Sequence, residues 1–353
     1  MSDSTTGVGI LGCGPVTQAI HLPTIDRLRG AFHVARVMDI DPAVAESVAG
    51  RVGSAWTTST EELLADDDVE VVVICSPHHV HAKQVIAACR AGKKAILCEK
   101  PLAMSQAEAQ EIAAVSAETG VPIVVGAMHT FDPGWLAARA KWADLVAKTH
   151  TIRYSIVLPR NPDFEDFATE IHSRPARPQR ERDLVDIAAD NMRGSIMGLA
   201  IHDLPLVRLF CLDFTDIELL SAQVLDPGGY LVNLRVGKRN VQLYGVNNSS
   251  WRPEWRFEAV ADDVSLVVDF PNSYVHAGSA VATFHYGSES MTYGPYLMNG
   301  YEAEWKYMAK LLAGTAEPID SQGLIDDLMF ALAIADMATE SVRASFTKDE
   351  VPA

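Results

Sequence analysis

The sequence predicts an α/β domain with a parallel, doubly wound sheet, followed by an α+β domain with a large open, mainly antiparallel sheet. Two domains are expected because 353 residues exceed what one hydrophobic core usually organises. Up to about residue 128, short apolar runs alternate with helical patterns, which predicts parallel strands joined by helices. After that point several strand patterns follow one another without helices, as is typical of antiparallel sheets. We therefore place the domains at residues 1–128 and 129–353.

The elements of the first domain follow from runs of β-branched residues, which suit strands covered on both faces, and from apolar residues at helical spacing between them. In chain order, the expected strands are 7–11, 32–38, 69–75, 95–98 and 121–126. The expected helices are 16–28, 42–52, 81–91 and 105–119.

The second domain is expected to contain strands in succession, with turn signals such as Asp226-Pro227-Gly228-Gly229 and Asn247-Asn248 between them. In chain order, the expected elements are a strand at 151–158, a loop rich in proline and arginine at 159–182, a helix at 199–210, several strands from 217 to about 284, and helices at 302–312 and 324–342.

Composition narrows the class of partner. The 29 basic and 46 acidic residues give a net charge of −17, and a field of that sign repels nucleic acids and anionic membrane surfaces. No apolar run reaches the roughly 18 residues of a membrane-spanning helix, and the first residues lack the basic region of a secretory signal. The five cysteines form no C-x-x-C pair, which favours a reducing compartment. We expect a soluble, cytoplasmic protein, and small neutral ligands remain open.

A glycine-rich turn, Gly12-Cys13-Gly14-Pro15-Val16-Thr17, follows the first expected strand. Gly12 permits the tight turn, and Gly14 lets the backbone approach a pyrophosphate at the N-terminus of the next helix. Thr17 replaces the third glycine of the G-x-G-x-x-G pattern, which loosens the packing of helix on strand. The strand before the turn and the helix after it predict a dinucleotide site that includes Gly12, Gly14, Pro15 and Val16.

Asp39 ends the second expected strand, where a carboxylate can accept hydrogen bonds from both ribose hydroxyls and repels a 2′-phosphate. It therefore favours NAD over NADP. The alternative is that Asp39 or Asp41 caps the following helix, in which Pro42 occupies the first position. We assign the ribose to Asp39 and the cap to Asp41.

Ser76 and Pro77 follow the third expected strand, at the carboxyl edge where doubly wound sheets bind ligands. His78, His79 and His81 come next. We expect no metal there, because no cysteine or carboxylate ligand lies near these imidazoles in the sequence. We prefer contact with the nicotinamide-side ribose or helix capping, and include Ser76, Pro77 and His81 among the cofactor-binding residues.

Three segments resemble the Gfo/Idh/MocA family of nicotinamide-dependent oxidoreductases: GCGPVTQAIHLPTI from residue 12, SPHHVHAKQVIAACRAGKKAILCEKPLAMSQAEA from residue 76, and GAMHTFDPGW from residue 126. The resemblance covers essentially the whole chain. It implies a Rossmann NAD-binding domain at 1–128, and at 129–353 a substrate-binding domain whose open sheet often forms the oligomer interface. It also implies a homo-oligomer, and substrates that are sugars, sugar derivatives or cyclitols.

Lys100 lies in Cys98-Glu99-Lys100-Pro101, the most specific element of this resemblance, just past a strand end. Oxidising a secondary alcohol needs a base within hydrogen-bond reach of the hydroxyl, and a desolvated lysine can shuttle that proton. The alternative is a surface lysine paired with Glu99. The resemblance implies that Lys100 is catalytic and that the bond before Pro101 is cis. We include Glu99 and Lys100 among the cofactor-binding residues.

His202, in the segment GSIMGLAIHDLPLVRLF, is the second candidate. A lone histidine on an apolar helix is usually a satisfied core residue, but the family pattern D-x-x-x-H implies that it faces the substrate. Gly198 occupies the aspartate position here, so His202 lacks the carboxylate that would orient it. Asp203 is adjacent, but on a helix it would point about 100° away from His202.

His129 follows the last parallel strand, at a position where the family often contacts substrate, and its alternative role is a hydrogen bond at the domain junction. The expected loop at 159–182 is either solvated or a lid or inter-subunit arm that brings an arginine to an anionic group of the substrate. Its arginines are Arg160, Arg174, Arg177, Arg180 and Arg182.

These residues together predict an NAD-dependent oxidoreductase that transfers a hydride between a secondary hydroxyl of a sugar, sugar derivative or cyclitol and the nicotinamide ring. The predicted catalytic residues are Lys100 and His202, and the predicted substrate contacts are Lys100, His129 and His202. Two alternatives stay open. One is an enzyme that uses tightly bound NAD transiently for elimination or epimerisation, and the other is a non-catalytic cofactor-binding regulator, which Gly198 makes conceivable.

Overall fold

The structure, a computed structural model, describes residues 5–142, 144–159, 161–174, 183–226, 228–247 and 253–349. The chain forms two compact units. The first contains residues 1–126, 165–176 and 301–328, and the second contains residues 127–164, 177–300 and 329–353. The chain therefore returns to the first unit twice after leaving it.

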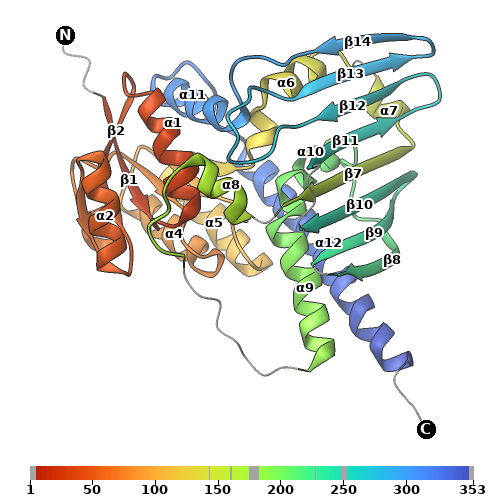
Figure 1. Cartoon of the computed structure of the whole chain (residues 1–353), viewed down its shortest axis with the longest axis horizontal. Coiled ribbons are helices and arrows are strands. Elements are labelled where there is room, and N and C mark those ends of the chain that lie inside the picture. The colour runs from red at the N-terminus through yellow and green to blue at the C-terminus, as the bar shows by residue number, and fades with distance from the viewer. Residues whose placement is uncertain are drawn as a thin grey trace. The chain divides into compact units, whose positions relative to one another are not determined.

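A six-stranded parallel sheet forms the centre of the first unit, in the order β3-β2-β1-β4-β5-β6. Figure 1 labels β1 and β2 of this sheet. Its strands are β1 (Thr6–Leu11), β2 (Phe32–Met38), β3 (Ala55–Thr57), β4 (Val71–Ile74), β5 (Ala95–Glu99) and β6 (Ile123–Gly126). The four residues of β4 are all buried, as a continuous apolar run predicts for a strand covered on both faces. The strand order reverses between β1 and β4, and the carboxyl ends at such a reversal border the crevice where doubly wound sheets bind ligands.

The helices of this unit agree with the predicted pattern. They are η1 (Thr17–His21, π-helical), α1 (Leu22–Arg27), α2 (Pro42–Val52), α3 (Thr60–Leu64), η2 (His78–Val80, 3-10), α4 (His81–Arg90), α5 (Gln106–Thr119) and most of α11 (Gly300–Leu312). Asp41 caps α2 by accepting a hydrogen bond from the Ala43 N–H at 2.9 Å, which confirms the predicted cap. Strand β3 and helix α3 were not predicted, because neither is long enough to establish a periodic pattern in the sequence.

An eight-stranded sheet forms the second unit, in the order β14-β13-β12-β11-β7-β10-β9-β8 (Figure 1). Its strands are β7 (Thr151–Leu158), β8 (Ile217–Leu225), β9 (Gly229–Val236), β10 (Arg239–Asn247), β11 (Glu254–Val260), β12 (Ser265–Asp269), β13 (Val281–Tyr286) and β14 (Glu289–Tyr293). Only the pairing of β7 with β10 is parallel, so the predicted mainly antiparallel sheet is confirmed.

One face of this sheet is covered by helices and the other is open. Along β7, Ile152, Tyr154 and Ile156 are buried, while Arg153 and Ser155 between them face outward. Helix α9 packs on β8 and β9, and α6 packs on β13 and β14. The helical elements are η3 (Met128–Phe131), α6 (Pro133–Arg139), α7 (Leu145–Lys148), α8 (Asn161–Ala168), α9 (Leu184–Gly198), η4 (Ala200–His202), α10 (Leu204–Arg208) and α12 (Ser321–Asp349), of which α8 and α12 each contribute residues to both units.

Two expectations for this region were wrong. The stretch expected as one helix at 199–210 consists of the short 3-10 turn η4 and the short helix α10. Pro205 accounts for the break, because it has no N–H to donate to residue 201 and its ring clashes with that carbonyl in a continuous helix. The loop expected at 159–182 contains helix α8.

No helix in the described ranges combines the length and apolar character that crossing a bilayer requires.

Asp132 provides a test of how the second unit is held together. Its buried carboxylate accepts hydrogen bonds from Gly134 and Trp135 at the start of α6, and from Ala280 just before β13. Asp132→Ala should lower the free energy of unfolding by about 2–4 kcal/mol, since a helix cap is lost and a buried N–H is left unpaired. Asp132→Asn keeps an acceptor oxygen and should cost less than half as much. Urea unfolding followed by tryptophan fluorescence measures both, and equal losses would contradict this role.

Candidate functional site

The turn after β1 is shaped by close contact with the loop after β4. Gly12 has a φ of +91°, and a Cβ at this position would lie 2.7 Å from the Ser76 N and 2.8 Å from the Cys75 carbonyl carbon. Only glycine fits both the left-handed conformation and this close approach. A Cβ at Gly14 would meet no atom within 4 Å, so the backbone there is open. These features suit a turn that a pyrophosphate approaches.

Thr17, at the third glycine position, is part of the packing rather than a gap in it. Its side chain is fully buried, and its hydroxyl donates to the Gly12 carbonyl at 2.5 Å. The hydrogen bond ties the first turn of the helix to the glycine that precedes it. The helix continues as a π-helical turn whose five residues are all buried.

Asp39 lies beside the same turn. One carboxylate oxygen accepts the Cys13 N–H at 2.8 Å, and the other accepts the Asp41 N–H at 3.0 Å. Each carboxylate oxygen has two lone pairs, so both retain capacity for a further donor. Asp39 is only half-buried, which leaves its carboxylate accessible to a ligand as well as bound to the turn.

The histidines after Ser76 and Pro77 have different positions. His81 is buried, and its two ring nitrogens lie 2.7 Å from the Ser76 carbonyl oxygen and 2.8 Å from the Pro101 carbonyl oxygen. It therefore joins the loop after β4 to the loop after β5, and neither nitrogen remains for a metal. The bond before Pro101 is cis, as the resemblance implies. Among the described residues, no group of three or more metal-ligating side chains is assembled.

Glu99, the last residue of β5, is held by a histidine from the π-helical turn. Its Oε1 lies 3.1 Å from His21 Nε2, and its Oε2 accepts the Lys100 N–H at 3.3 Å. Trp305 can only donate, and its Nε1 lies 3.2 Å from His21 Nδ1, so the His21 proton is on Nε2 and points at Glu99. Burial alone would raise the pKa of Glu99, but the hydrogen bond from His21 and the charge of Lys100 hold it below its usual value.

Lys100 follows at the carboxyl edge of the sheet, partly buried. Burial lowers the pKa of its ammonium group, because desolvation disfavours the charged form, and the neighbouring Glu99 carboxylate acts in the opposite direction. A lysine whose pKa is lowered in this way can accept a proton at a lower pH than a lysine in water. The carboxyl edge of the parallel sheet thus bears the glycine-rich turn after β1, Asp39 after β2, and after β5 the amine of Lys100 with its lowered pKa.

Two of the three predicted substrate contacts, His129 and His202, lie in the second unit and pack against one indole. The ring of Trp255 receives His129 edge-on with centroids 4.6 Å apart and His202 edge-on at 5.2 Å. His129 also stacks on Phe270 at 3.9 Å. His202 Nδ1 lies 3.3 Å from Met128 Sδ.

Asp203 joins His129 and Trp255 in this cluster. It is fully buried, lies 2.6 Å from His129 Nδ1, and accepts the Trp255 indole N–H. The expected geometry assumed a continuous helix, but the backbone breaks at Asp203 before α10. His129 therefore has a carboxylate partner. Asp203 was expected to point away from His202, and its side chain binds His129 in the same cluster. Only its position next to His202 in the sequence could have suggested this.

The arginine-rich segment is described only in part. Arg160, Arg177, Arg180 and Arg182 lie outside the described residues. Arg174 donates to Glu165 at 3.0 Å and to Asp166 at 2.5 Å, so its guanidinium is paired within its own segment.

Comparisons with known proteins place this chain among oxidoreductases. The family model GFO_IDH_MocA, described as "Oxidoreductase family, NAD-binding Rossmann fold", matches residues 6–127. The inositol 2-dehydrogenase of Mycolicibacterium smegmatis is 36% identical over 336 residues, which cover 86% of this chain and 91% of that protein. KijD10, a 3-ketoreductase from Actinomadura kijaniata solved with NADP, has a TM-score of 0.70 at 17% identity, covering 96% of this chain and 98% of that one, and so shares the fold.

Other relatives match over a shorter length. Inositol 2-dehydrogenase 3 of Saccharopolyspora erythraea is 36% identical over 132 residues, which are 37% of this chain and 38% of that protein. The match to the inositol 2-dehydrogenase of Acidothermus cellulolyticus spans 58% of that protein.

The two glycines of the turn give a matched pair of variants. Gly12→Ala should destabilise the protein by about 2 kcal/mol or more, because alanine there combines a left-handed φ with backbone contacts under 3 Å. Gly14→Ala meets nothing, so its unfolding free energy should stay within about 1 kcal/mol of the parent. Chemical denaturation measures both, and similar losses would show that the turn is not built on Gly12.

Proposed function

The chain belongs to the Gfo/Idh/MocA oxidoreductase family, and on that premise we propose that it is an NAD-dependent dehydrogenase. It would transfer a hydride between a secondary hydroxyl of a sugar, sugar derivative or cyclitol and the nicotinamide ring. The observation that carries the proposal is Lys100, a partly buried amine with a lowered pKa. It lies at the carboxyl edge of the parallel sheet, which also bears the glycine-rich turn and Asp39. The relative from M. smegmatis is named an inositol 2-dehydrogenase, which makes cyclitols the first substrates to test.

The residues of the first unit fit a dinucleotide. We assign the pyrophosphate to the turn at Gly12, Gly14, Pro15 and Val16, where the open backbone at Gly14 leaves room for it. We assign the adenosine ribose to Asp39, whose following residue, Ile40, is exposed and offers no cation to a 2′-phosphate. Ser76, Pro77, His81 and Glu99 complete the proposed contacts. When bound, the cofactor supplies the carbon that accepts or returns the hydride.

Lys100 is the proposed acid/base group for the hydroxyl proton. In the oxidising direction its neutral amine accepts the proton from the hydroxyl oxygen as the carbon loses its hydride, and in the reducing direction its ammonium returns that proton. Glu99, already bound to His21, keeps an anionic charge beside the amine and so stabilises the ammonium that forms. We assign His202 as the second catalytic residue and His129 as a substrate contact.

We propose a cytoplasmic location, because all five cysteines are free and four of them are buried.

The experiment that tests this function is NADH formation at 340 nm with inositols, sugars and sugar acids, each with NAD and with NADP. A hit with NAD supports the dehydrogenase and begins to name its substrate. NAD binding by calorimetry, together with silence across the panel, would overturn the proposal in favour of transient redox chemistry or a regulator, to which Gly198 points. A Cβ at Gly198 meets no atom within 4 Å, so Gly198→Asp can be made and assayed in the same panel.

Asp39 should determine the choice between the two cofactors. Asp39→Ala should weaken NAD binding by about 10- to 100-fold, the cost of losing hydrogen bonds to a charged acceptor, and weaken NADP binding much less. Asp41→Ala, which removes only the helix cap, should leave the ratio of the two affinities unchanged. Calorimetry with both cofactors measures this ratio. Equal losses of NAD and NADP affinity in Asp39→Ala would refute the ribose assignment.

Lys100→Met should reduce kcat by about 10²- to 10⁴-fold, the usual contribution of a general base, while the dissociation constant of NAD changes by no more than about threefold. In the parent, kcat/KM should rise with pH through a pKa below the roughly 10.4 of free lysine, because burial lowers the pKa of Lys100 and the neutral amine is the base. That limb should be absent from the variant. Lys94→Met, at an exposed lysine paired with Glu70, is the control. Retained turnover in Lys100→Met would mean that another group moves the proton.

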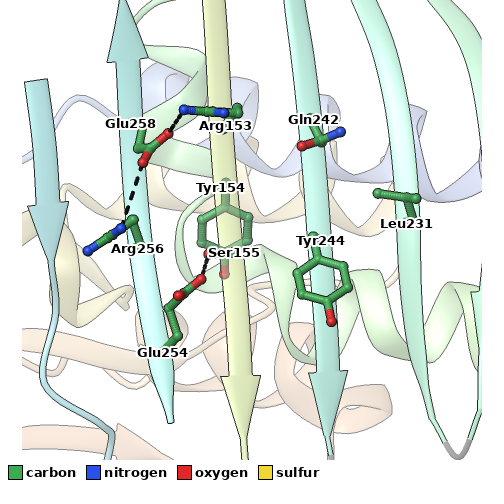
Figure 2. Close-up of a pocket in the computed structure, with 9 residues that line it drawn as sticks. All are labelled: Arg153, Tyr154, Ser155, Leu231, Gln242, Tyr244, Glu254, Arg256 and Glu258. Atoms are coloured by element: carbon green, nitrogen blue, oxygen red, sulfur yellow. Dashed lines mark hydrogen bonds and ion pairs between the residues drawn. The ribbon is translucent and has the colours of Figure 1, made fainter. Parts of the chain in front are cut away.

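We also propose that the chain forms a homo-oligomer through the open face of the eight-stranded sheet. Figure 2 shows this face over β7, β9, β10 and β11, with Arg256 and Glu258 on one side of β7 and Tyr244 and Leu231 on the other. Arg153 pairs with Glu258 at 2.5 Å, and Glu254 accepts a hydrogen bond from the Ser155 hydroxyl. These groups already have partners, which lowers the cost of covering them with a second copy.

Sedimentation velocity tests this assembly. The parent should sediment as a multiple of 38.3 kDa, and Tyr244→Lys should shift it toward the monomer, because it places an unpaired cation in the buried face. Leu212→Lys, at an exposed position outside the sheet, should leave the distribution unchanged. A monomeric parent would rule the interface out.

A further inference from the structure

We propose that Asp203 is a positioning residue that fixes the tautomer of His129, so that His129 Nε2 accepts a hydrogen bond from a substrate hydroxyl. The inference rests on the proposed function and deepens it. It names His129 Nε2 as the acceptor that binds a hydroxyl group of the substrate and does not bind a carbonyl oxygen. It assigns Asp203 to a task that neither the D-x-x-x-H pattern nor the predicted helix indicated.

The two oxygens of Asp203 have separate partners. Its Oδ2 accepts the indole N–H of Trp255, which can only donate, and its Oδ1 lies 2.6 Å from His129 Nδ1. The carboxylate is fully buried. A buried carboxylate needs such donors, because an unpaired charge in the interior costs several kcal/mol. Asp203 is therefore an acceptor at both oxygens.

This arrangement determines where the proton of His129 lies. An ionised carboxylate has no proton to donate, so the bond to Asp203 requires the hydrogen to be on Nδ1. In neutral imidazole the lone pair is then on Nε2. Packing prevents the ring from turning over, since Phe270 stacks on its face and Trp255 meets it edge-on.

Nε2 is the atom of His129 that a ligand can use. Within the described part of the chain Nε2 has no hydrogen-bond partner, and the residue keeps 3% of its surface exposed. A lone pair at Nε2 accepts from a hydroxyl but not from a carbonyl oxygen, which has no hydrogen to give. The cluster thus favours a substrate that carries a hydroxyl at this position.

The same cluster explains how the chain can tolerate Gly198. Gly198 stands where the family pattern has an aspartate, four residues before His202. Asp203, which follows His202, binds the imidazole of His129. Both imidazoles pack on Trp255, and Asp203 binds the one of His129. Within the described part of the chain, an imidazole held by a carboxylate is therefore present at His129.

Asp203→Asn reverses the tautomer with little change of shape. The amide oxygen can still accept from Trp255, while the amide nitrogen must donate to His129 Nδ1, which moves the imidazole proton to Nε2. The same substitution in a Ser-His-Asp triad leaves the geometry intact and produces the wrong tautomer. His129 would then present a donor where the substrate hydroxyl needs an acceptor.

The kinetic test uses the substrate found in the panel. Asp203→Asn should lower kcat/KM for alcohol oxidation by about 10²-fold and leave the dissociation constant of NAD within about twofold. His129→Phe should cost about as much, and the double variant should cost no more than either single one, since both remove the same hydrogen bond. Parental kcat/KM in Asp203→Asn, alongside an inactive Lys100→Met, would overturn the inference and leave the proposed function standing.

A second measurement does not depend on turnover. With ¹⁵N-labelled histidine, the parent at neutral pH should show a His129 ring protonated at Nδ1, with that proton shifted downfield by the bond to a carboxylate, and Asp203→Asn should show protonation at Nε2. A parent spectrum with the proton on Nε2 would refute the inference even if the variants fail to fold. If no substrate in the panel yields NADH, that result counts against the dehydrogenase, and this spectrum still tests the tautomer of His129.

Discussion

Each unit of the protein contains a buried carboxylate that constrains the packing around it: Glu99 in the first unit and Asp203 in the second. An ionised carboxylate removed from water needs donors on its oxygens, and each of these residues has an imidazole as one of them. The first unit supplies His21 on a π-helical turn and a glycine, Gly126, whose missing side chain leaves room for Glu99, since a Cβ there would lie 3.0 Å from it. The second unit supplies His129 and the indole of Trp255. His21 thus partners the first of these charges, and His129 and Trp255 partner the second.

The first carboxylate also makes the edge of the parallel sheet rigid where chemistry is proposed. Glu99 is bonded to the N–H of Lys100, and His81 joins the loop that contains Pro101 to the loop after β4. That loop is in turn packed against Gly12. The loops after β1, β4 and β5 are thus in direct contact, and Lys100 lies on a segment that these contacts hold in place. Rigid support of this kind is what a proton-transferring group requires, because small displacements of such a group cost large factors in rate.

The second unit shows how a family pattern can lose one carboxylate and retain an oriented imidazole. The break at Pro205 ends the helical path after η4, so that Asp203 does not follow the direction a helix would give it. Its side chain reaches His129 and Trp255 instead. The absence of an aspartate at position 198 is therefore a weaker argument against catalysis than the D-x-x-x-H pattern alone suggests, because Asp203 supplies a carboxylate to His129.

The sequence by itself determined the fold class, most strand and helix positions of the first unit, the tight turn at Gly12, the cap at Asp41 and the location of Lys100 after a strand end. Each of these depends on a few consecutive residues, whose periodicity or backbone chemistry is legible without the rest of the chain. The partners of the charged groups were decided by the tertiary structure. His21 and Glu99 are 78 residues apart, and His129 and Asp203 are 74 apart. Such pairs have no local pattern, because they form only when packing removes both members from water and leaves each as the other's available partner.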